Sequence, residues 1–265
     1  MDLQGRRVLL TGASGGIGNT IARTLHRHGA TVILSGRRAD ALETLRNELG
    51  ERVEVVQADL ASAAEVDALL ERAGQVDVLV ANAALPASGR LDSFSPEELD
   101  RSIQVNLHAP MRLARGLVPG MAERGSGHLV FISSMAGKVA NGGGSVYSAT
   151  KFGLRGFSGG LRDELRGSGV GVTTVFPSFI SDAGLFAETG LKLPPGVGTR
   201  SPQQVADAVI RGIERDRGEI DVAPLPVRAS AWLAGIAPGA VAGMARKLGS
   251  ADMAERLADA QRIKR

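Results

Sequence analysis

Short apolar runs alternate along the chain with segments whose apolar residues recur at helical spacing. The apolar runs predict seven strands: Arg7–Thr11, Thr31–Ser35, Val53–Gln57, Val76–Ala81, His128–Ser133, Gly171–Phe176 and Glu219–Val222. After the first of them, the spacing of Ile17, Ile21 and Leu25 is typical of an amphipathic helix. Because most of the strands are nearly continuous in apolar residues, helices must cover both faces of their sheet. The pattern predicts an α/β fold of Rossmann type, with a doubly wound, seven-stranded parallel sheet.

Two helix starts carry capping signals. Ser95-Pro-Glu-Glu98 and Ser201-Pro-Gln-Gln204 each combine a capping serine, a first-turn proline and an acid or amide three residues after the serine. These signals predict helix boundaries and carry no function.

Residues 178–200 break the alternation. They are rich in glycine and proline but also carry Phe179, Leu185 and Phe186, so they predict a lid or binding loop that packs on the body. After the last predicted strand the chain leaves the sheet. We expect a single Rossmann-type domain over residues 1–226, which includes the lid, and a C-terminal helical extension over residues 227–265.

Composition is that of a soluble globular protein, with 43% hydrophobic and 22% charged residues. The net charge of +3 is spread along the chain, and aromatic residues make up only 3%, so we expect no nucleic-acid partner. The absence of cysteine excludes disulfides and thiolate chemistry. No signal peptide precedes the first strand, which together with the cysteine count favours a cytoplasmic protein. We expect no metal site.

One stretch, Ala229–Ala245, contains no charged residue and reaches the lower length limit of a membrane-spanning helix. It also contains Pro238 and several glycines, which favour a packed or surface-lying helical hairpin over a spanning helix. Because Arg262, Lys264 and Arg265 follow, contact with an anionic membrane is the less favoured alternative to subunit packing or to cover for the site.

A glycine turn follows the first predicted strand and precedes a helix. Gly12, Gly16 and Gly18 have the spacing G-x-x-x-G-x-G, which differs from G-x-G-x-x-G because Ile21 holds the last position of that pattern. Glycines at such a turn let the backbone approach a pyrophosphate at the N-terminus of the helix. The turn therefore predicts a dinucleotide site.

The end of the second predicted strand indicates which dinucleotide binds. NAD is usually held there by an acid on the ribose 2′-hydroxyl, but this chain has Arg37 and Arg38 and no acid. A guanidinium pairs well with a 2′-phosphate, so we expect NADP(H) in preference to NAD(H). The alternative is that both arginines are solvated at a strand end.

Tyr147 and Lys151 lie four residues apart at a predicted helix start, so both side chains share one face of the helix. The lysine ammonium is expected to lower the pKa of the phenol, which would then donate and accept a proton near neutral pH. The alternative is an ordinary solvated helix face.

Four separated signals together make the chain resemble the short-chain dehydrogenase/reductase family from Gly5 to Val222. They are Thr11-Gly-x-x-x-Gly-x-Gly18, Asn82-Ala-Ala84, Ser134 and Tyr147-x-x-x-Lys151, with twelve residues between Ser134 and Tyr147. The resemblance implies an oxidoreductase that interconverts a carbonyl and a secondary alcohol, in a homodimer or homotetramer. It implies four catalytic residues: Asn106, Ser134, Tyr147 and Lys151. Asn106 is expected in the helix that Ser95 caps. It implies cofactor contacts from Gly12, Ser14, Gly16, Ile17, Gly18, Arg37, Arg38, Asp59, Leu60, Asn82, Ala83, Tyr147, Lys151, Pro177 and Ile180.

Within this resemblance each residue has an implied role. Tyr147 would be the general acid or base, Lys151 would lower its pKa and bind the nicotinamide ribose, and Ser134 would polarise the substrate oxygen. Asn106 would position a water molecule, or would be an ordinary helix-face amide. Asp59 would lie beside the adenine ring, or would cap a helix in competition with Ser62.

The chain departs from the family pattern at several cavity positions. After the fourth strand the chain has Asn82-Ala83-Ala84-Leu85, where the family often has Asn-Asn-Ala-Gly or Asn-Ala-Gly. Ser178 follows Pro177 where the family usually has glycine. Ser181-Asp182 replaces a threonine that commonly contacts the nicotinamide. The apolar lid favours a small, hydrophobic carbonyl or alcohol substrate. A non-catalytic NADP-binding sensor and a family epimerase or dehydratase are the alternatives.

Overall fold

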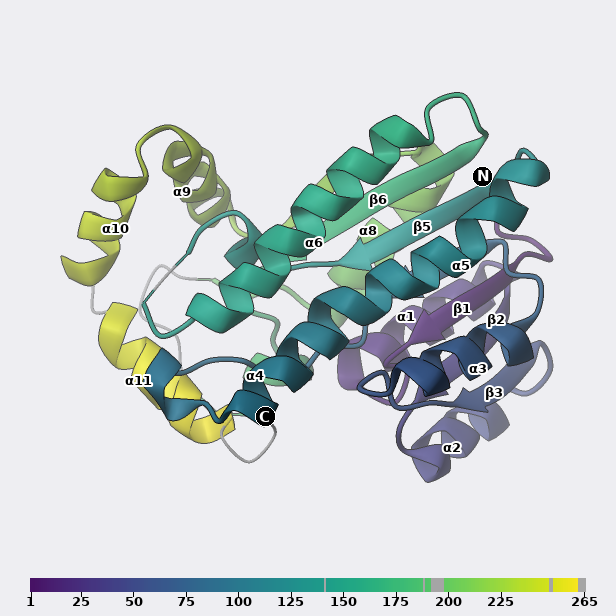
Figure 1. Cartoon of the computed structure of the whole chain (residues 1–265), viewed down its shortest axis with the longest axis horizontal. Coiled ribbons are helices and arrows are strands. Elements are labelled where there is room, and N and C mark those ends of the chain that lie inside the picture. The colour runs from purple at the N-terminus through teal and green to yellow at the C-terminus, as the bar shows by residue number, and fades with distance from the viewer. Residues whose placement is uncertain (141, 188, 192–197, 248–249, 262–265) are drawn as a thin grey trace.

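A parallel sheet of seven strands forms the centre of the molecule (Figure 1). The computed structural model describes residues 1–140, 142–187, 189–191, 198–247 and 250–261. The strands are β1 (Arg7–Thr11), β2 (Thr31–Gly36), β3 (Val53–Gln57), β4 (Val78–Ala81), β5 (Gly127–Ile132), β6 (Val170–Pro177) and β7 (Glu219–Val222). Their order is β3-β2-β1-β4-β5-β6-β7, and each neighbouring pair is parallel. The predicted fold class is confirmed.

Strand β4 starts at Val78, later than the predicted Val76. The carboxylate of Asp77 accepts the backbone N–H of Arg7 at 3.0 Å, a place that a strand carbonyl would otherwise take. The ladder between β1 and β4 therefore begins one residue after Asp77, with Val8 opposite Val78.

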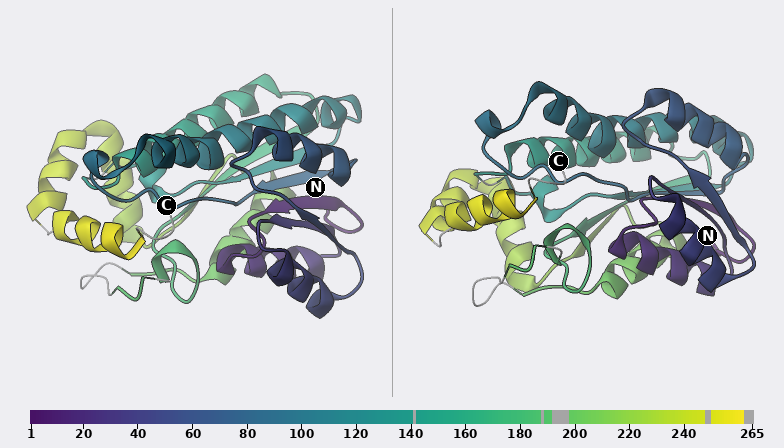
Figure 2. Two further views of the ribbon diagram at one scale, coloured as in Figure 1. Left: turned by 60° about the horizontal axis from the view of Figure 1, so that its bottom comes forward. Right: turned by 90° about the horizontal axis from the view of Figure 1, so that it is seen from below.

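Helices cover both faces of the sheet, as the apolar strands require (Figure 2). Successive strand residues point to opposite faces, so Leu10 joins one apolar cluster and Leu9 joins the other. The helices of the body are α1 (Gly16–Arg27), α2 (Ala39–Leu49), α3 (Ala63–Ala73), α4 (Pro96–Ile103), α5 (Ala109–Glu123), α6 (Ser145–Glu164), α7 (Gly184–Ala187) and α8 (Pro202–Arg215). Apolar residues of α1, α2 and α8 enter the first cluster, and those of α3, α5 and α6 enter the second.

Both predicted capping boxes are present. In α4, the Ser95 hydroxyl accepts the Glu98 N–H at 3.2 Å, and the Glu98 carboxylate accepts the Ser95 N–H at 2.8 Å. In α8, Ser201 and Gln204 make the same reciprocal pair. These caps satisfy backbone donors that a helix start otherwise leaves open.

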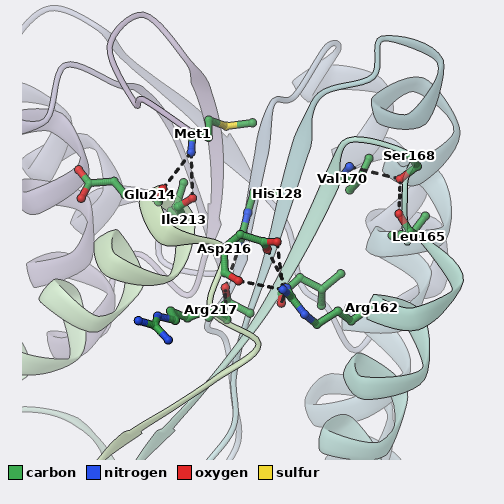
Figure 3. Close-up of polar contacts among 12 residues, drawn as sticks. Met1, His128, Arg162, Leu165, Ser168, Val170, Ile213, Glu214, Asp216 and Arg217 are labelled. Atoms are coloured by element: carbon green, nitrogen blue, oxygen red, sulfur yellow. Dashed lines mark hydrogen bonds and ion pairs between the residues drawn. The ribbon is translucent and has the colours of Figure 1, made fainter.

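Polar contacts connect the amino-terminal halves of β5 and β6 (Figure 3). His128 and Thr173 are buried there, whereas Asp216 is exposed. The Thr173 hydroxyl donates its hydrogen bond to the Arg217 carbonyl at 2.7 Å. Because a hydroxyl has only one hydrogen, it accepts the hydrogen bond from Nε2–H of His128, 2.8 Å away. Arg162 binds the Asp216 carboxylate through both Nη atoms at 2.7 and 3.0 Å. The amino group of Met1 donates to the carbonyl of Ile213 at 3.2 Å. These contacts lie away from the carboxyl ends of the strands.

Three further helices follow β7: α9 (Leu225–Ile236), α10 (Pro238–Lys247) and α11 (Ser250–Gln261). They lie beyond the carboxyl ends of β5 and β6, on the side of the molecule away from the N-terminus (Figure 1). The uncharged stretch that predicts a hairpin forms parts of α9 and α10. Of the helices in the described part of the chain, none has both the length and the apolar character that crossing a bilayer requires. The outer side of α9 exposes Trp232 and Ile236.

Candidate active site

The glycine turn after β1 has the close backbone contacts that its spacing predicts. Gly12 has a φ of +68°, and a β-carbon there would lie 2.8 Å from Cα of Ala83. A β-carbon at Gly18 would lie 2.1 Å from the carbonyl oxygen of Gly12. Side chains at these two positions are therefore excluded by contact, and at Gly12 also by backbone conformation.

The N-terminus of α1 has no side-chain cap. Ser62, Ser95 and Ser201 cap α3, α4 and α8 with their hydroxyls, whereas α1 has Gly15 at the same position. Its first backbone N–H groups and the positive end of its dipole are therefore available to an anionic ligand. This end of the site fits the pyrophosphate of a dinucleotide.

Asn82 holds the turn in place. Its Nδ2 donates to the carbonyls of Thr11 and Gly12 at 3.0 and 3.2 Å. The Thr11 hydroxyl in return accepts the backbone N–H groups of Asn82 and Ala83, at 3.1 and 3.2 Å. The amide nitrogen of Asn82 thus positions the loop.

The two arginines predicted to select the cofactor lie at the end of β2, at the same cavity as the glycine turn. Arg38 donates from Nη2 to the Ser14 carbonyl, which brings its guanidinium beside the turn. Arg37 is exposed to solvent. Both arginines therefore line the cavity beside the glycine turn.

Asp59 does not cap a helix. Ser62 caps α3 by accepting the Glu65 N–H at 3.3 Å. Asp59 accepts the Ala61 N–H at 3.0 Å and pairs with Arg101 at 3.8 Å. Of the two alternatives for Asp59, the structure excludes the cap and leaves its carboxylate at the edge of the cavity.

Tyr147 and Lys151 lie on one face of α6, opposite the end of β5. The Lys151 ammonium is 5.5 Å from the centroid of the Tyr147 ring. It is only 2% exposed and donates to the Ile132 carbonyl at 3.0 Å. Ser134 hydrogen-bonds with the Tyr147 phenol. The neighbouring Ser133 donates instead to the Lys151 carbonyl at 3.1 Å, so its hydroxyl joins strand to helix.

The predicted lowering of the tyrosine pKa is wrong for the chain's own groups. Burial raises the pKa of Tyr147 to about 12, and the hydrogen bond with Ser134 only partly opposes this effect. Burial also lowers the pKa of Lys151 to about 8. The Lys151 charge is not among the causes of the pKa shift at Tyr147, so desolvation sets its direction. Tyr147 is therefore a protonated phenol at neutral pH.

Asn106 lies just beyond the last residue of the helix that Ser95 caps. The helix capped by Ser95 ends at Ile103, and Asn106 lies in the π-helical turn that follows, Gln104–His108. Its Oδ1 accepts the Leu85 N–H at 2.7 Å, and its Nδ2 donates to the Leu85 carbonyl at 3.0 Å. It is not among the described residues that line the cavity. Its side chain anchors Leu85, which does line the cavity. The role of Asn106 in positioning a water molecule stays a prediction.

A cavity of about 1160 Å³ joins these groups. Each residue predicted to contact the cofactor lines it, as do Ser134 and the altered positions Ala84, Leu85 and Ser178. The cavity continues past the described part of the predicted lid to the C-terminal helices, whose lining residues are Val227, Ser230, Val241, Met244, Leu257 and Gln261. Cover for the site was one of the roles expected of the C-terminal segment, and this lining agrees with it. The sequence did not indicate which of its residues would line the cavity.

The described part of the predicted lid is tied at its base. Ile180 and Arg200 form a parallel bridge, and the Arg200 N–H donates to the Phe179 carbonyl at 2.9 Å. The Phe179 and Phe186 rings are in contact, with centroids 4.8 Å apart. These two rings pack on each other within the predicted lid, and both residues line the cavity.

Comparison with known proteins agrees with this geometry. The family model described as short chain dehydrogenase matches residues 6–192. Ketoacyl reductase HetN of Nostoc sp. is 37% identical over 235 residues, which cover 86% of this chain and 82% of the relative. A short-chain dehydrogenase from Sphingobium yanoikuyae, solved with NADPH, has a TM-score of 0.76 and 32% identity, covering 92% of this chain and 95% of its own. A 3-ketoacyl-(acyl-carrier-protein) reductase from Brucella melitensis, solved with NADH, has a TM-score of 0.74 and 26% identity, covering 83% and 97%. The chain therefore belongs to the short-chain dehydrogenase/reductase family and is an NAD(P)-dependent dehydrogenase or reductase.

Proposed function

We propose that this protein reduces a ketone to a secondary alcohol with NADPH, and catalyses the reverse reaction with NADP⁺, with Tyr147 as the proton donor and acceptor. The observation that carries the proposal is that Ser134, Tyr147 and Lys151 line the same cavity as the glycine turn and the two arginines. A protein that only sensed NADP would need no proton donor beside its cofactor.

When bound, NADPH would supply the hydride to the carbonyl carbon. Ser134 would donate a hydrogen bond to the carbonyl oxygen and polarise it. The Tyr147 phenol would give its proton to that oxygen as the C=O double bond becomes a C–O single bond. Lys151 would stabilise the phenolate left behind, because a neighbouring ammonium favours the charged form of an acid.

The pKa of Tyr147 bears on the direction of the reaction. With a pKa of about 12, the phenol carries its proton at neutral pH and is ready for reduction. Oxidation would first require the phenolate. We therefore expect reduction to be the faster direction near neutral pH, with oxidation rising as the pH is raised.

The substrate proposed is a hydrophobic ketone. The cavity walls near Tyr147 are apolar on the side of the predicted lid, where Phe179, Leu185 and Phe186 lie. The relative from Nostoc is named as a ketoacyl reductase, which makes a ketone on an acyl chain the first class to test. Terpenoid and steroid-like ketones are the next.

The experiment that tests this function compares wild type with Tyr147→Phe. NADPH absorbance is followed over a panel of ketones, and NADPH affinity is measured separately by fluorescence. Loss of the proton donor is expected to lower kcat by about 10²- to 10⁴-fold, with the NADPH Kd nearly unchanged. Turnover that survives the substitution would refute the role of Tyr147.

Cofactor preference is tested with NADPH and NADH on the wild type, Arg37→Ala and Arg38→Ala. The wild type is expected to have the higher kcat/KM with NADPH. Each substitution is expected to reduce that preference by about tenfold, the size of one charged hydrogen bond. Arg166→Ala is the control, since Arg166 is exposed and pairs with Asp163 on α6. A wild type that prefers NADH would contradict the assignment.

A further inference from the structure

Gln261, at the end of α11, is buried although it lies close to the chain's C-terminus. It is 5% exposed and lines the cavity together with Leu257 of the same helix. Figures 1 and 2 both show α11 on the side of the sheet where the strands end. A polar side chain here is unexpected, because its cavity neighbours in the C-terminal helices, among them Val241 and Leu257, are mostly apolar.

The two ends of the Gln261 amide have different partners. Its Nε2 donates to the Leu185 carbonyl, 3.0 Å away in α7. That bond fixes the orientation of the amide, because a carbonyl can only accept. Its Oε1 is buried and has no hydrogen-bond partner among the described residues.

A buried amide oxygen without a donor is costly. Leaving one unsatisfied costs about 1–3 kcal/mol, and native structures pair the large majority of such atoms. Because Gln261 lines a cavity, a ligand in that cavity can supply the missing donor. The atom left free is an oxygen, so the ligand group must carry a hydrogen.

We propose that Gln261 forms a distal subsite that binds a hydroxyl or amide N–H at the far end of the substrate. The proposal rests on the function proposed above and defines its substrate further, as an elongated apolar ketone with a hydrogen-bond donor remote from the carbonyl. Leu185, held by the same amide, would form the apolar side of this subsite.

An unpaired serine hydroxyl at the cavity does not define the substrate in the same way as the Gln261 amide oxygen. Ser178 Oγ is also buried without a partner and lines the cavity, directly after β6. A hydroxyl can donate or accept, so it is satisfied by either kind of ligand group. Only Gln261 restricts the ligand to a donor.

The test uses two ketones with one skeleton, a medium-chain methyl ketone and its ω-hydroxy analogue. The wild type is expected to have about a tenfold higher kcat/KM for the ω-hydroxy ketone, since a polar site discriminates against a ligand that leaves it unpaired. In Gln261→Leu the ratio between the two ketones is expected to fall to about one. A ratio near one in the wild type, or a preference that survives in Gln261→Leu, overturns the subsite.

Leu257→Ala is the matched control. Leu257 lies one helical turn before Gln261 and lines the same cavity. Its truncation removes apolar contact, so it is expected to weaken both ketones alike and to keep their ratio. A Leu257→Ala variant that loses the ratio as Gln261→Leu does would mean that the subsite depends on helix packing and not on the amide.

Calorimetry separates failure of the subsite from failure of the proposed function. Both ketones are titrated into the wild type and Gln261→Leu in the presence of NADP⁺. If neither ketone is reduced but the ω-hydroxy ketone binds more tightly only when Gln261 is present, the subsite stands and the proposed reaction fails. If the two ketones are reduced and bind equally in both proteins, the reaction stands and the subsite fails.

Discussion

Each end of the sheet buries one titratable side chain to the same depth, but the hydrogen-bond partners of the two side chains differ. His128 near the amino end and Lys151 near the carboxyl end are each 2% exposed. Burial lowers the pKa of His128 to about 4 and the pKa of Lys151 to about 8. In both residues burial therefore disfavours the charged form.

The difference lies in their partners. His128 is a neutral ring whose Nε2–H is accepted by Thr173, and the neighbouring Asp216 carboxylate is held by Arg162 (Figure 3). Lys151 has three donors, and in the described residues its ammonium makes one hydrogen bond, to the Ile132 carbonyl. Its remaining donors lie at the wall of a cavity.

This contrast separates two uses of a buried titratable group. Where a buried group is hydrogen-bonded and does not line the cavity, as at His128, it stabilises the fold. Where donors remain and a cavity adjoins them, the group is placed to act on a ligand. The depth of burial and the pKa shift alone would not distinguish the two ends.

The largest expected effect is on kcat, when Lys151 and His128 are substituted one at a time. Lys151→Met is expected to lower kcat by about 10³-fold, since Lys151 would stabilise the phenolate formed at Tyr147. His128→Gln keeps an amide donor for Thr173 and is expected to change kcat by less than about twofold at neutral pH. Steady-state kinetics on one ketone measures both. Equal losses in the two variants would remove the distinction between the ends of the sheet.

For the free energy of unfolding at acid pH, the larger contribution is expected from His128. The unfolded chain binds a proton at His128 below pH ~6.5, but the folded chain does so only below about 4. Between these values the unfolded state holds more protons, so the free energy of unfolding falls as the pH falls. The loss contributed by His128 is about 3 kcal/mol by the lower end of that window.

Urea denaturation at neutral pH and near the lower end of that window measures this loss. His128→Gln is expected to flatten the pH dependence, because the variant has no group to protonate there. His108→Gln, at an exposed position, is the control and should keep the wild-type slope. A His128→Gln variant as acid-sensitive as wild type would show that another group carries the effect.

Much of this fold is predictable from the sequence because its signals are local. Parallel strands buried on both faces appear as apolar runs, and the boxes at Ser95 and Ser201 mark helix starts within four residues. The glycine turn is equally local, since one strand and one helix define it. These features depend on neighbours along the chain, which the sequence displays directly.

The remaining features depend on contacts between distant segments. The π-helical turn from which Asn106 hydrogen-bonds to Leu85 has no sequence signal. The pKa of Tyr147 depends on how deeply the folded chain buries it. Gln261 meets Leu185 only because a C-terminal helix returns to the cavity, and the two residues are 76 positions apart.

The smallest expected effect compares two glycines on either side of β1. Gly5 precedes the strand with a φ of +71°, and Gly12 follows it with a φ of +68°. A methyl group at Gly5 would meet nothing within 4 Å, whereas at Gly12 it would lie 2.8 Å from Cα of Ala83. Both substitutions to alanine cost about 1–2 kcal/mol of backbone strain. Gly12→Ala adds a clash of about 1–3 kcal/mol and displaces the turn proposed to face the cofactor.

Thermal unfolding and NADPH titration of the two variants measure the difference. Gly5→Ala is expected to lower Tm slightly and to leave the NADPH Kd unchanged. Gly12→Ala is expected to lower Tm further and to weaken NADPH, because Ala83 must move away from the turn that Asn82 holds. If both variants bind NADPH as the wild type does, the close contact at Gly12 serves folding only. The carboxyl end of β1 would then be no more specialised for a ligand than the amino end.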